Sequence, residues 1–498
     1  MNVNPITRLD YPDPDVIRVE DTYYMVSTTM HFMPGCEILQ SFDLVHWEHA
    51  TYVYETLDHT DAQQLKSGQN IYGQGMWAAS LRYHEGRFYI CFVANDTRKT
   101  YLYTSEKIDG PWKKQLIEGF YHDGSLLFDE DGRNYIVYGN DEIWITELNE
   151  DLTAPKKDGL HRLLVSDHKN PELGYEGSHI QKINGYYYIF LIHSQRDRWM
   201  RTEACFYSDS LEGEFTGGDV LCDDRGYCGQ GVAQGGIVDT PDGKWYAMLF
   251  QDSGAVGRIP ILLPVTWKDH FPVFGQNGHV PEEIEVHSTR PGYIYQPLVG
   301  SDDFCNGLLP RWQFNHDPDP RYYHLDALQG TYTITTREVC TELTQAVNTL
   351  TQRMSYPSCA AEVTVDASAL KEGDVAGLCA LQSCYAAVGI TKHHGKYEVL
   401  MLDKKEDGIL DMTEGTVVES HQMDFRLEAD FCNMKDEARC YYRVNKGDWL
   451  PIGTVHKLYF KLDHFTGCRF GLFCYAAEKT GGSACFRDFK YYDVDEIS

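Results

Sequence analysis

Long hydrophobic runs are missing from this sequence of 498 residues. No segment holds the roughly 18 consecutive apolar residues that a membrane-spanning helix needs. The first fifteen residues, MNVNPITRLDYPDPD, also lack the apolar stretch of a signal peptide. These features exclude a membrane helix and predict a cytoplasmic location.

Positive charge is scarce as well. Lys and Arg number 44 against 74 Asp and Glu, so the formal net charge is −30. A chain this acidic repels phosphate backbones and anionic lipid, which excludes nucleic acid and membrane surfaces as partners. A neutral substrate such as a sugar is unaffected by this charge.

Paired cysteines and helical heptads are the other absences. The 15 cysteines are an odd number and include no CxxC pair and no zinc-ligand spacing, so we expect free thiols, mostly buried. Aromatic residues are instead abundant, with 34 Tyr, 22 Phe and 9 Trp. Aromatic side chains fit pleated surfaces, so the composition predicts an all-β protein.

A repeated plan runs through the first 250 residues: a hydrophobic run, a polar turn, then an aromatic-rich run. Each copy predicts a β-hairpin. The turns are 46 to 65 residues apart, a spacing typical of four-stranded blades and of a five-bladed β-propeller. A sandwich of unrelated hairpins is the alternative. The copies are VIRVEDTYYMVS, LRYHEGRFYICF, LLFDEDGRNYIVY, IQKINGYYYIFL and GIVDTPDGKWYAML.

The repeat also predicts where chemistry is located. Equivalent positions, 8 or 9 residues before each turn, are held by Asp13, Trp77, Asp123, Glu176 and Gln234. If the run between is the innermost strand of a blade, these five side chains converge on one end of the central channel. Taken singly, Asp13 and Asp123 would be read as turn-capping residues, and calcium binding is a further alternative.

Three converging acids meet the needs of glycoside hydrolysis. One carboxylate activates water while another stays protonated to donate to the leaving oxygen. Crowding by two aspartates should raise the pKa of Glu176 toward roughly 6–7. Acids on different blades should stand about 6.5–9.5 Å apart, which implies inversion of the anomeric carbon.

The motifs around these acids resemble glycoside hydrolase family 43. Tyr11–Pro14 is similar to the family opening, whose Asp is the general base, which implies that role for Asp13. His122–Leu126 resembles the motif whose Asp orients the acid and tunes its pKa, here Asp123. Tyr175–His179 is similar to the motif with the general acid, here Glu176.

The resemblance also implies sugar-binding residues. Trp77 stands in a stretch similar to that of the family's substrate-site tryptophan, and Arg258 where an arginine approaches the sugar. His179 belongs to the general-acid motif and is taken as a substrate contact, and Phe32 is expected to line the pocket. Many members have a metal-binding histidine where Gln234 stands, and glutamine is a poor ligand by comparison, so we expect no required cofactor and disfavour a calcium ion. Gln234 is instead expected to bind the substrate by a hydrogen bond to the sugar or to a water, with simple polar filling of the channel as the alternative.

A second domain follows a proline-containing linker at Ser288–Leu298. Short alternating runs then predict a β-sandwich, giving a propeller over 1–290 and a sandwich over 300–498. Ser301–Phe304 resembles the concanavalin-like domain of β-xylosidases and arabinofuranosidases. His464–Gly467 resembles the loop with which that domain closes the pocket, so Phe465 is a predicted substrate contact. The flat interface is expected to favour homo-oligomers.

The sequence therefore predicts an inverting exo-glycosidase that removes a terminal α-L-arabinofuranosyl or β-D-xylosyl residue from hemicellulose oligosaccharides of the arabinoxylan type. A non-catalytic sugar-binding propeller and a glycosidase for another sugar remain open. A retaining β-fructosidase-type propeller would require a motif such as N-D-P-N, which this sequence lacks.

Overall fold

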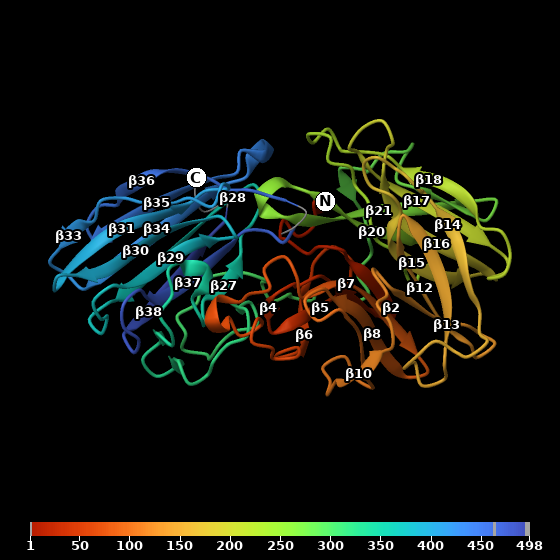
Figure 1. Cartoon of the computed structure of the whole chain (residues 1–498). Coiled ribbons are helices and arrows are strands. Elements are labelled where there is room, and N and C mark those ends of the chain that lie inside the picture. Colours follow the sequence, from red (N-terminus) through yellow and green to blue (C-terminus); the bar gives the residue numbers. More distant parts are fainter. Residues whose placement is uncertain (1, 462–464, 494–498) are drawn as a thin grey trace.

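β-Strands form nearly all of the regular structure in the computed structural model, which describes residues 2–461 and 465–493. The N-terminal half of the chain forms one ring-like body and the C-terminal half a second, flatter one (Figure 1). His464 lies outside the described residues. Within them, no helix is long and apolar enough to cross a membrane. The helical segments are the short 3-10 turns Lys66–Gly68 (η1), Gly254–Val256 (η2), Leu343–Gln345 (η3) and Cys432–Met434 (η4).

The first half contains five four-stranded antiparallel sheets, as the repeat predicts. Blade one is β2 (Asp15–Val19), β3 (Thr22–Val26), β5 (Gly35–Ser41) and β6 (Glu48–Tyr54). Blade two is β7 (Met76–His84), β8 (Arg87–Ala94), β9 (Lys99–Ser105) and β10 (Lys113–Ile117). Blade three is β11 (Ser125–Phe128), β12 (Asn134–Asn140), β13 (Glu142–Leu148) and β14 (His161–Ser166). Blade four is β15 (Glu176–Ile183), β16 (Tyr186–Ser194), β17 (Arg201–Ser208) and β18 (Thr216–Leu221). Blade five is β19 (Ile237–Asp239), β20 (Trp245–Asp252), β21 (Arg258–Lys268) and β22 (Phe271–Phe274).

The predicted hairpins form the first two strands of every blade. Their turns use left-handed backbone: Glu20, Glu85 and Asn184 have φ of 55°, 48° and 50°. Each precedes an aspartate or glycine in a two-residue connection, and such turns match the right-handed twist of the flanking strands. The Asp/Asn/Gly turn signals therefore identified real hairpins.

Apolar side chains on facing blades close the ring. Separate buried clusters join blades one and two, two and three, three and four, and four and five. A fifth cluster joins blade five back to blade one, where Val16 and Tyr23 pack with Val238 and Tyr246. The short strands β1 (Asn2–Val3) and β23 (Glu283–Ile284) pair beside this junction. The five-bladed propeller is thus a closed ring.

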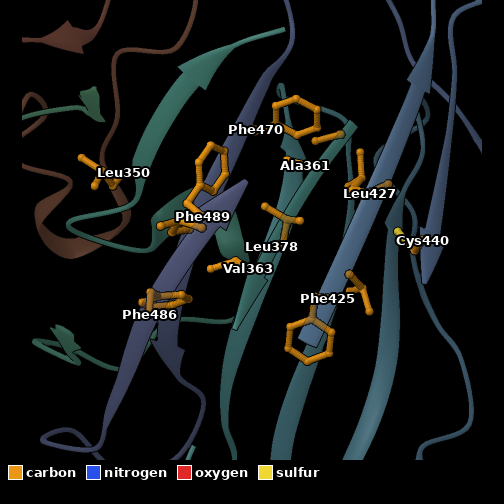
Figure 2. Close-up of a cluster of buried hydrophobic side chains, with 14 of the residues drawn as sticks. Leu350, Ala361, Val363, Leu378, Phe425, Leu427, Cys440, Phe470, Phe486 and Phe489 are labelled. Carbon is orange, nitrogen blue, oxygen red and sulfur yellow. The ribbon is translucent and has the colours of Figure 1, made fainter. Parts of the chain in front are cut away.

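The second half is a sandwich of two antiparallel sheets. Their facing sides bury one continuous apolar core that includes Leu378, Phe425, Phe470 and Phe486 (Figure 2). One sheet contains β24 (Gln313–Asn315), β27 (Leu350–Arg353), β29 (Asp374–Leu381), β30 (Tyr385–His393), β31 (Lys396–Lys404), β32 (Leu410–Met412), β33 (Thr416–Val418) and β37 (Arg469–Ala476). The other contains β25 (Tyr323–Asp326), β26 (Thr331–Thr335), β28 (Ser358–Asp366), β34 (Gln422–Asp430), β35 (Glu437–Val444), β36 (Leu450–Lys457) and β38 (Ser483–Tyr492).

The propeller contributes a strand to the sandwich. β4 (Phe32–Met33) leaves blade one and pairs with β24 at the edge of the first sheet. Phe32 is 1% exposed, and the Arg469 guanidinium lies 3.4 Å from its ring centre. The structure therefore places Phe32 inside the contact between the two bodies, where it packs on an arginine of the sandwich.

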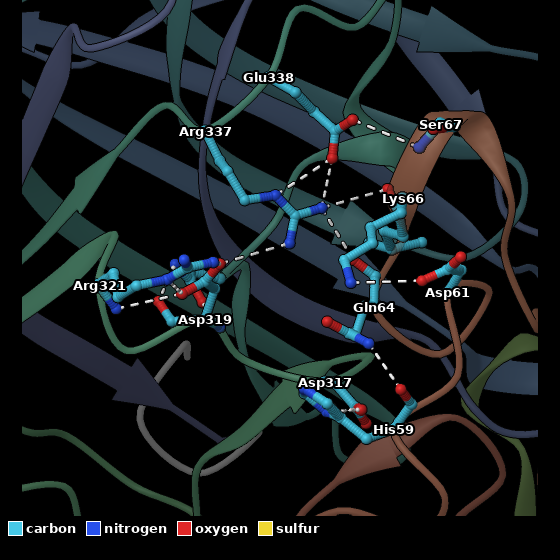
Figure 3. A network of polar contacts seen from close by, with 12 residues as sticks. His59, Asp61, Gln64, Lys66, Ser67, Asp317, Asp319, Arg321, Arg337 and Glu338 are labelled. Atoms are coloured by element: carbon cyan, nitrogen blue, oxygen red, sulfur yellow. Dashed lines mark hydrogen bonds and ion pairs between the residues drawn. The ribbon is translucent and has the colours of Figure 1, made fainter.

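A polar network also joins the two bodies, between the loop after β6 and residues 317–338 (Figure 3). Arg337 donates to the carbonyl of Gln64 at 2.9 Å. His59 contacts the buried carboxylate of Asp317 at 2.7 Å, and the Ser67 amide donates to Glu338 at 3.3 Å. These part-buried and exposed polar contacts add to the packing that joins the two bodies.

All fifteen cysteines are free in the structure, as expected from their spacing. Ten are buried, and the exposed thiols are Cys222, Cys228, Cys305 and Cys432. Most cysteines therefore act as small apolar side chains in the strands.

Candidate active site

Three of the five equivalent positions adopt left-handed backbone just before the inner strand. Asp13, Asp123 and Gln234 have φ of 53°, 48° and 61°, and they precede β2, β11 and β19. This conformation is costly for residues other than glycine and is retained where the surrounding structure requires it. The repeat thus places a residue of left-handed backbone at the start of the inner strand in blades one, three and five.

In blades two and four the equivalent residues begin the inner strand itself. Trp77 and Glu176 each lie at a register shift in the pairing, in β7 and β15 respectively. The next residue, Gly177, has φ 65°, and a Cβ added there would lie 2.7 Å from the Gln234 side chain. Such irregularities re-aim a side chain, and here they turn the Glu176 carboxylate toward blade three.

Asp13 is buried and doubly held. The Arg258 guanidinium donates to its Oδ1 from Nη1 at 2.6 Å, and the Thr28 hydroxyl donates to its Oδ2 at 2.5 Å. The exposed fraction of Asp13 is 2%. Both carboxylate oxygens are therefore fixed in direction, which is what a group that must accept a proton from one positioned water requires.

Asp123 and Glu176 meet around His122. The Nε2 of His122 lies 3.5 Å from Asp123 Oδ2 and 3.5 Å from Glu176 Oε2. The amide of Gly177 donates to Asp123 at 3.0 Å, and the Asn140 side chain donates to Glu176 at 2.9 Å. Asp123 is thus bonded to the backbone next to Glu176, in a position to orient it.

The charges in this cluster alter its pKa values in opposite directions. Burial raises the pKa of Asp123 to about 6. His122 acts to lower this pKa, whereas Glu176 and Asp13 act to raise it further. Burial also acts to raise the pKa of Glu176, but His122, followed by Arg201 and Arg258, outweighs it and lowers that pKa. We expected a raised pKa for Glu176, and this expectation is wrong for the ligand-free protein because His122 lies beside the carboxylate.

His122 itself is cationic in this setting. Burial alone would lower its pKa, but Asp123 and Glu176 raise it to about 9. The predicted general acid therefore shares its pocket with an imidazole whose pKa is raised in favour of the charged form, a partner that sequence reasoning did not single out.

The aromatic wall of the cluster comes from both bodies. Trp77 lies edge-on to His122, with ring centres 6.0 Å apart, and edge-on to Phe465, with ring centres 5.4 Å apart. The Arg258 guanidinium lies 4.1 Å from the centre of the Phe465 ring. Phe465 of the sandwich thus covers the groups that hold Asp13, and it connects them to Trp77.

The arginine that holds Asp13 is itself held by a buried ion-pair chain. Asp252 Oδ1 lies 3.2 Å from Arg258 Nε, and its Oδ2 lies 2.6 Å from Arg201 Nη1. All three residues are buried. Sequence reasoning missed Arg201 and Asp252; Asp252 lies six residues before Arg258 in the same hairpin, which was the available signal.

His179 lies in another layer of the channel. Its Nδ1 is 3.1 Å from Asp15 Oδ1, and Arg82 binds the other oxygen of Asp15 at 2.8 Å. Arg82 also donates to Ser125 at 2.6 Å, so the network joins four blades. Burial would raise the pKa of Asp15, but Arg82 and His179 hold it below its usual range. The structure gives His179 a role in holding the blades together and does not bring it to the carboxylate cluster.

Gln234 is buried at the axis, and its backbone N–H donates to the Glu203 carboxyl at 2.7 Å. Burial raises the pKa of Glu203 well above its usual range. Among the described residues, the set of His, Cys and carboxylate atoms that lie within 4.8 Å of one another, and so could share a metal ion, belongs to His122, Asp123 and Glu176. In the part of the chain that the structure describes, no such set lies around Gln234, so its surroundings do not fit an axial ion.

Comparison with known proteins agrees with this geometry. Residues 3–272 match the family model for glycosyl hydrolases family 43. The chain belongs to this family. Residues 301–492 match the β-xylosidase C-terminal concanavalin A-like domain. The family 43 chain is therefore a glycoside hydrolase with a carbohydrate substrate.

Curated relatives resemble this family 43 enzyme over most of its length. A β-xylosidase from Formosa agariphila is 26% identical over 99% of this chain and 89% of the relative. A non-reducing end α-L-arabinofuranosidase from Bacteroides ovatus is 24% identical over 82% of this chain and 79% of the relative.

Solved structures include near neighbours. A bifunctional family 43 protein from Bacteroides eggerthii has a TM-score of 0.92 and 42% identity over 99% of this chain. This chain spans only 63% of that larger protein. A family 43 glycoside hydrolase engineered to display endo-xylanase and exo-arabinofuranosidase activity has a TM-score of 0.86 and 27% identity, with 99% of each chain covered.

Replacing His122 with glutamine in this family 43 enzyme should shift its pH profile. The cation lowers the pKa of Glu176, so its loss raises that pKa. An acid must be protonated to donate, so kcat/KM falls as pH rises through the Glu176 pKa. The basic limb of kcat/KM should therefore move to higher pH in His122→Gln. The exposed His168→Gln should keep the native profile, and an unmoved limb in His122→Gln would refute this role of His122.

Proposed function

We propose that the protein is an inverting exo-glycosidase that releases terminal α-L-arabinofuranosyl or β-D-xylosyl residues from arabinoxylan-type oligosaccharides. The observation that carries this proposal is that Asp13 and the Asp123–Glu176 pair converge on one end of the channel. Arg258 holds Asp13, and Phe465 lies over Arg258. Relatives named as β-xylosidase and α-L-arabinofuranosidase support the choice of pentose.

In this mechanism Asp13 accepts the proton of the attacking water. Arg258 and Thr28 each use one oxygen of the carboxylate and so aim its remaining lone pairs. Glu176 donates a proton to the leaving oxygen, and Asp123 orients it through the Gly177 amide. Acid–base catalysis of this kind supplies about 10²–10⁴ in rate.

Inversion is supported by the separate places of base and acid. Asp13 belongs to blade one and Glu176 to blade four, so the predicted base and acid reach the channel from different blades. An inverting enzyme needs its two carboxyls about 6.5–9.5 Å apart to leave space for a water, whereas retaining enzymes place them about 5–5.5 Å apart.

Exo action is supported by the cover over the cluster. Phe465 lies against both Trp77, which contacts His122, and Arg258, which holds Asp13. An aromatic wall formed by two bodies suits one terminal sugar whose C–H face stacks on a ring. A long open groove would suit internal cleavage of a polymer instead.

The direct test uses aryl glycosides of α-L-arabinofuranose and β-D-xylose with the purified chain. We expect cleavage of one or both, with the ratio of kcat/KM values naming the preferred sugar. Proton NMR of the first product should show the opposite anomeric configuration to the substrate. A product of retained configuration would overturn inversion, and no cleavage of either glycoside would overturn the pentosidase proposal.

A further inference from the structure

One buried carboxylate, that of Asp10, lies where the two bodies meet beside the catalytic pocket. Asp10 is 2% exposed and comes shortly before the predicted base, Asp13, in the chain. The Arg258 backbone N–H donates to its Oδ1 at 2.7 Å, and the Gly467 backbone N–H donates to its Oδ2 at 2.7 Å. The first donor belongs to blade five and the second to the sandwich, so one side chain joins the two bodies.

Both donors stand close in sequence to side chains of the pocket. The guanidinium of Arg258 holds Asp13, and the ring centre of Phe465, just before Gly467 in the chain, lies 4.1 Å from that guanidinium. Asp10 therefore bonds to the backbone on both sides of the contact between Phe465 and Arg258.

The Gly467 backbone packs directly on the turn η2 of blade five. A Cβ added at Gly467 would lie 2.0 Å from the Val256 carbonyl oxygen and 2.9 Å from Cβ of Asp10. The next amide, that of Cys468, donates to the Ala255 carbonyl at 2.8 Å. Only glycine fits so close an approach of two backbones, so this segment of the sandwich lies tightly against the residues that lead into Arg258.

The backbone of Asp10 is held as well. Arg353 of the sandwich donates from Nε to the Asp10 carbonyl at 2.8 Å, and the Tyr11 amide donates to the Arg258 carbonyl at 2.9 Å. Burial raises the pKa of Asp10 to about 6, whereas the two amides that it binds act to lower this pKa. Hydrogen bonds from backbone donors favour the ionised carboxylate, so both oxygens serve to hold the two amides in place.

We propose that Asp10 is a positioning residue: its carboxylate holds the Phe465 segment of the sandwich against Arg258 and so fixes the wall on which the terminal sugar lies. The part of this statement that concerns the sugar rests on the proposed function, whereas the part that concerns the backbone does not. Asp10 acts only through other residues and contacts no reacting atom.

Hydrogen–deuterium exchange tests the backbone part without any substrate. Asp10→Ala removes both acceptors, so a peptide that spans Phe465–Gly467 should exchange about tenfold faster than in the native chain. Asp10→Asn keeps one oxygen and should give a smaller increase. Asp436→Ala is the matched control, because it removes another buried carboxylate of the junction, one that accepts from the Ala255 amide at 3.1 Å. Native exchange of the peptide is expected in that control.

Steady-state kinetics on aryl pentosides tests the consequence for the sugar. Asp10→Ala should raise KM about tenfold, the scale of one lost hydrogen bond, because the wall at Phe465 is no longer fixed. The value of kcat should fall by less than about threefold, since Arg258 and Thr28 still hold the Asp13 carboxylate. In a Phe465→Ala background, where the wall is already removed, Asp10→Ala should raise KM by less than about twofold.

Gly467→Ala disturbs the same contact from the sandwich and should reproduce both effects, so it decides the matter if Asp10→Ala fails to fold. Unchanged exchange in the Phe465–Gly467 peptide would overturn the role of Asp10, whatever the activity. Equal rises in KM with and without the Phe465 ring would overturn its action through that side chain. A native chain that cleaves no aryl pentoside would count against the proposed function alone, because faster exchange in Asp10→Ala would still establish the backbone contact.

Discussion

Replacing Glu176 with alanine is expected to lower kcat/KM on unactivated pentose oligosaccharides by about 10²–10⁴. Glu176 lies where it can protonate the leaving oxygen, and Asn140 and His122 are its neighbours. A leaving group of low pKa departs without a proton. The loss should therefore be much smaller on dinitrophenyl glycosides than on oligosaccharides, and steady-state kinetics on both substrates measures the difference.

Glu172→Gln is the matched control for this variant, since Glu172 is exposed on the loop that leads into β15. It should keep native kcat/KM on both substrates. Equal losses on good and poor leaving groups in Glu176→Ala would contradict its role as general acid. Such a result would instead assign to Glu176 a role in binding the sugar.

Asp13→Asn is expected to lower kcat by about 10²–10⁴ on every substrate, whatever the leaving group, because each turnover needs an activated water. An amide cannot accept the proton, but it retains the volume of the carboxylate and can accept from Arg258. Substrate binding should therefore persist. Titration of the variant with xylobiose measures the binding, and steady-state kinetics measures kcat.

Asp21→Asn serves as the control for Asp13→Asn, because Asp21 lies at the exposed hairpin turn of the same blade and pairs with Arg290. It should leave kcat unchanged. If Asp13→Asn kept native turnover, Asp13 would not be the base. If the native chain bound sugar without any turnover to lose, the protein would be the sugar-binding propeller that the sequence left open.

The repeat allowed more to be predicted than any single motif did. The hairpin turns, the five blades and the sandwich were predicted from turn residues and alternation, and the structure confirms them. The positions of Asp13, Asp123 and Glu176 were predicted from their shared distance to the turns. The hairpins could be predicted because a β-hairpin is local: its turn, register and first residue are set within about fifteen residues of chain.

Contacts between blades were not predictable in the same way. The pKa of Glu176 depends on His122 of a neighbouring blade, and the sequence indicated crowding by acids but no cation between them. Likewise, His179 was assigned to the sugar site because it shares a motif with Glu176. The register shift in β15 between Glu176 and His179 interrupts the alternation of the strand, and His179 contacts Asp15 instead.

By itself the sequence determined the local structure of this protein: the hairpins, their number, and which residues begin the inner strands. Short-range hydrogen bonds and turn conformations decide these features. Only the tertiary structure decided that Phe32 packs on Arg469, that Phe465 covers Arg258, and that Asp252 links Arg258 to Arg201. Those contacts join residues on opposite bodies or on different blades, and their geometry follows from how the closed ring and the sandwich pack together.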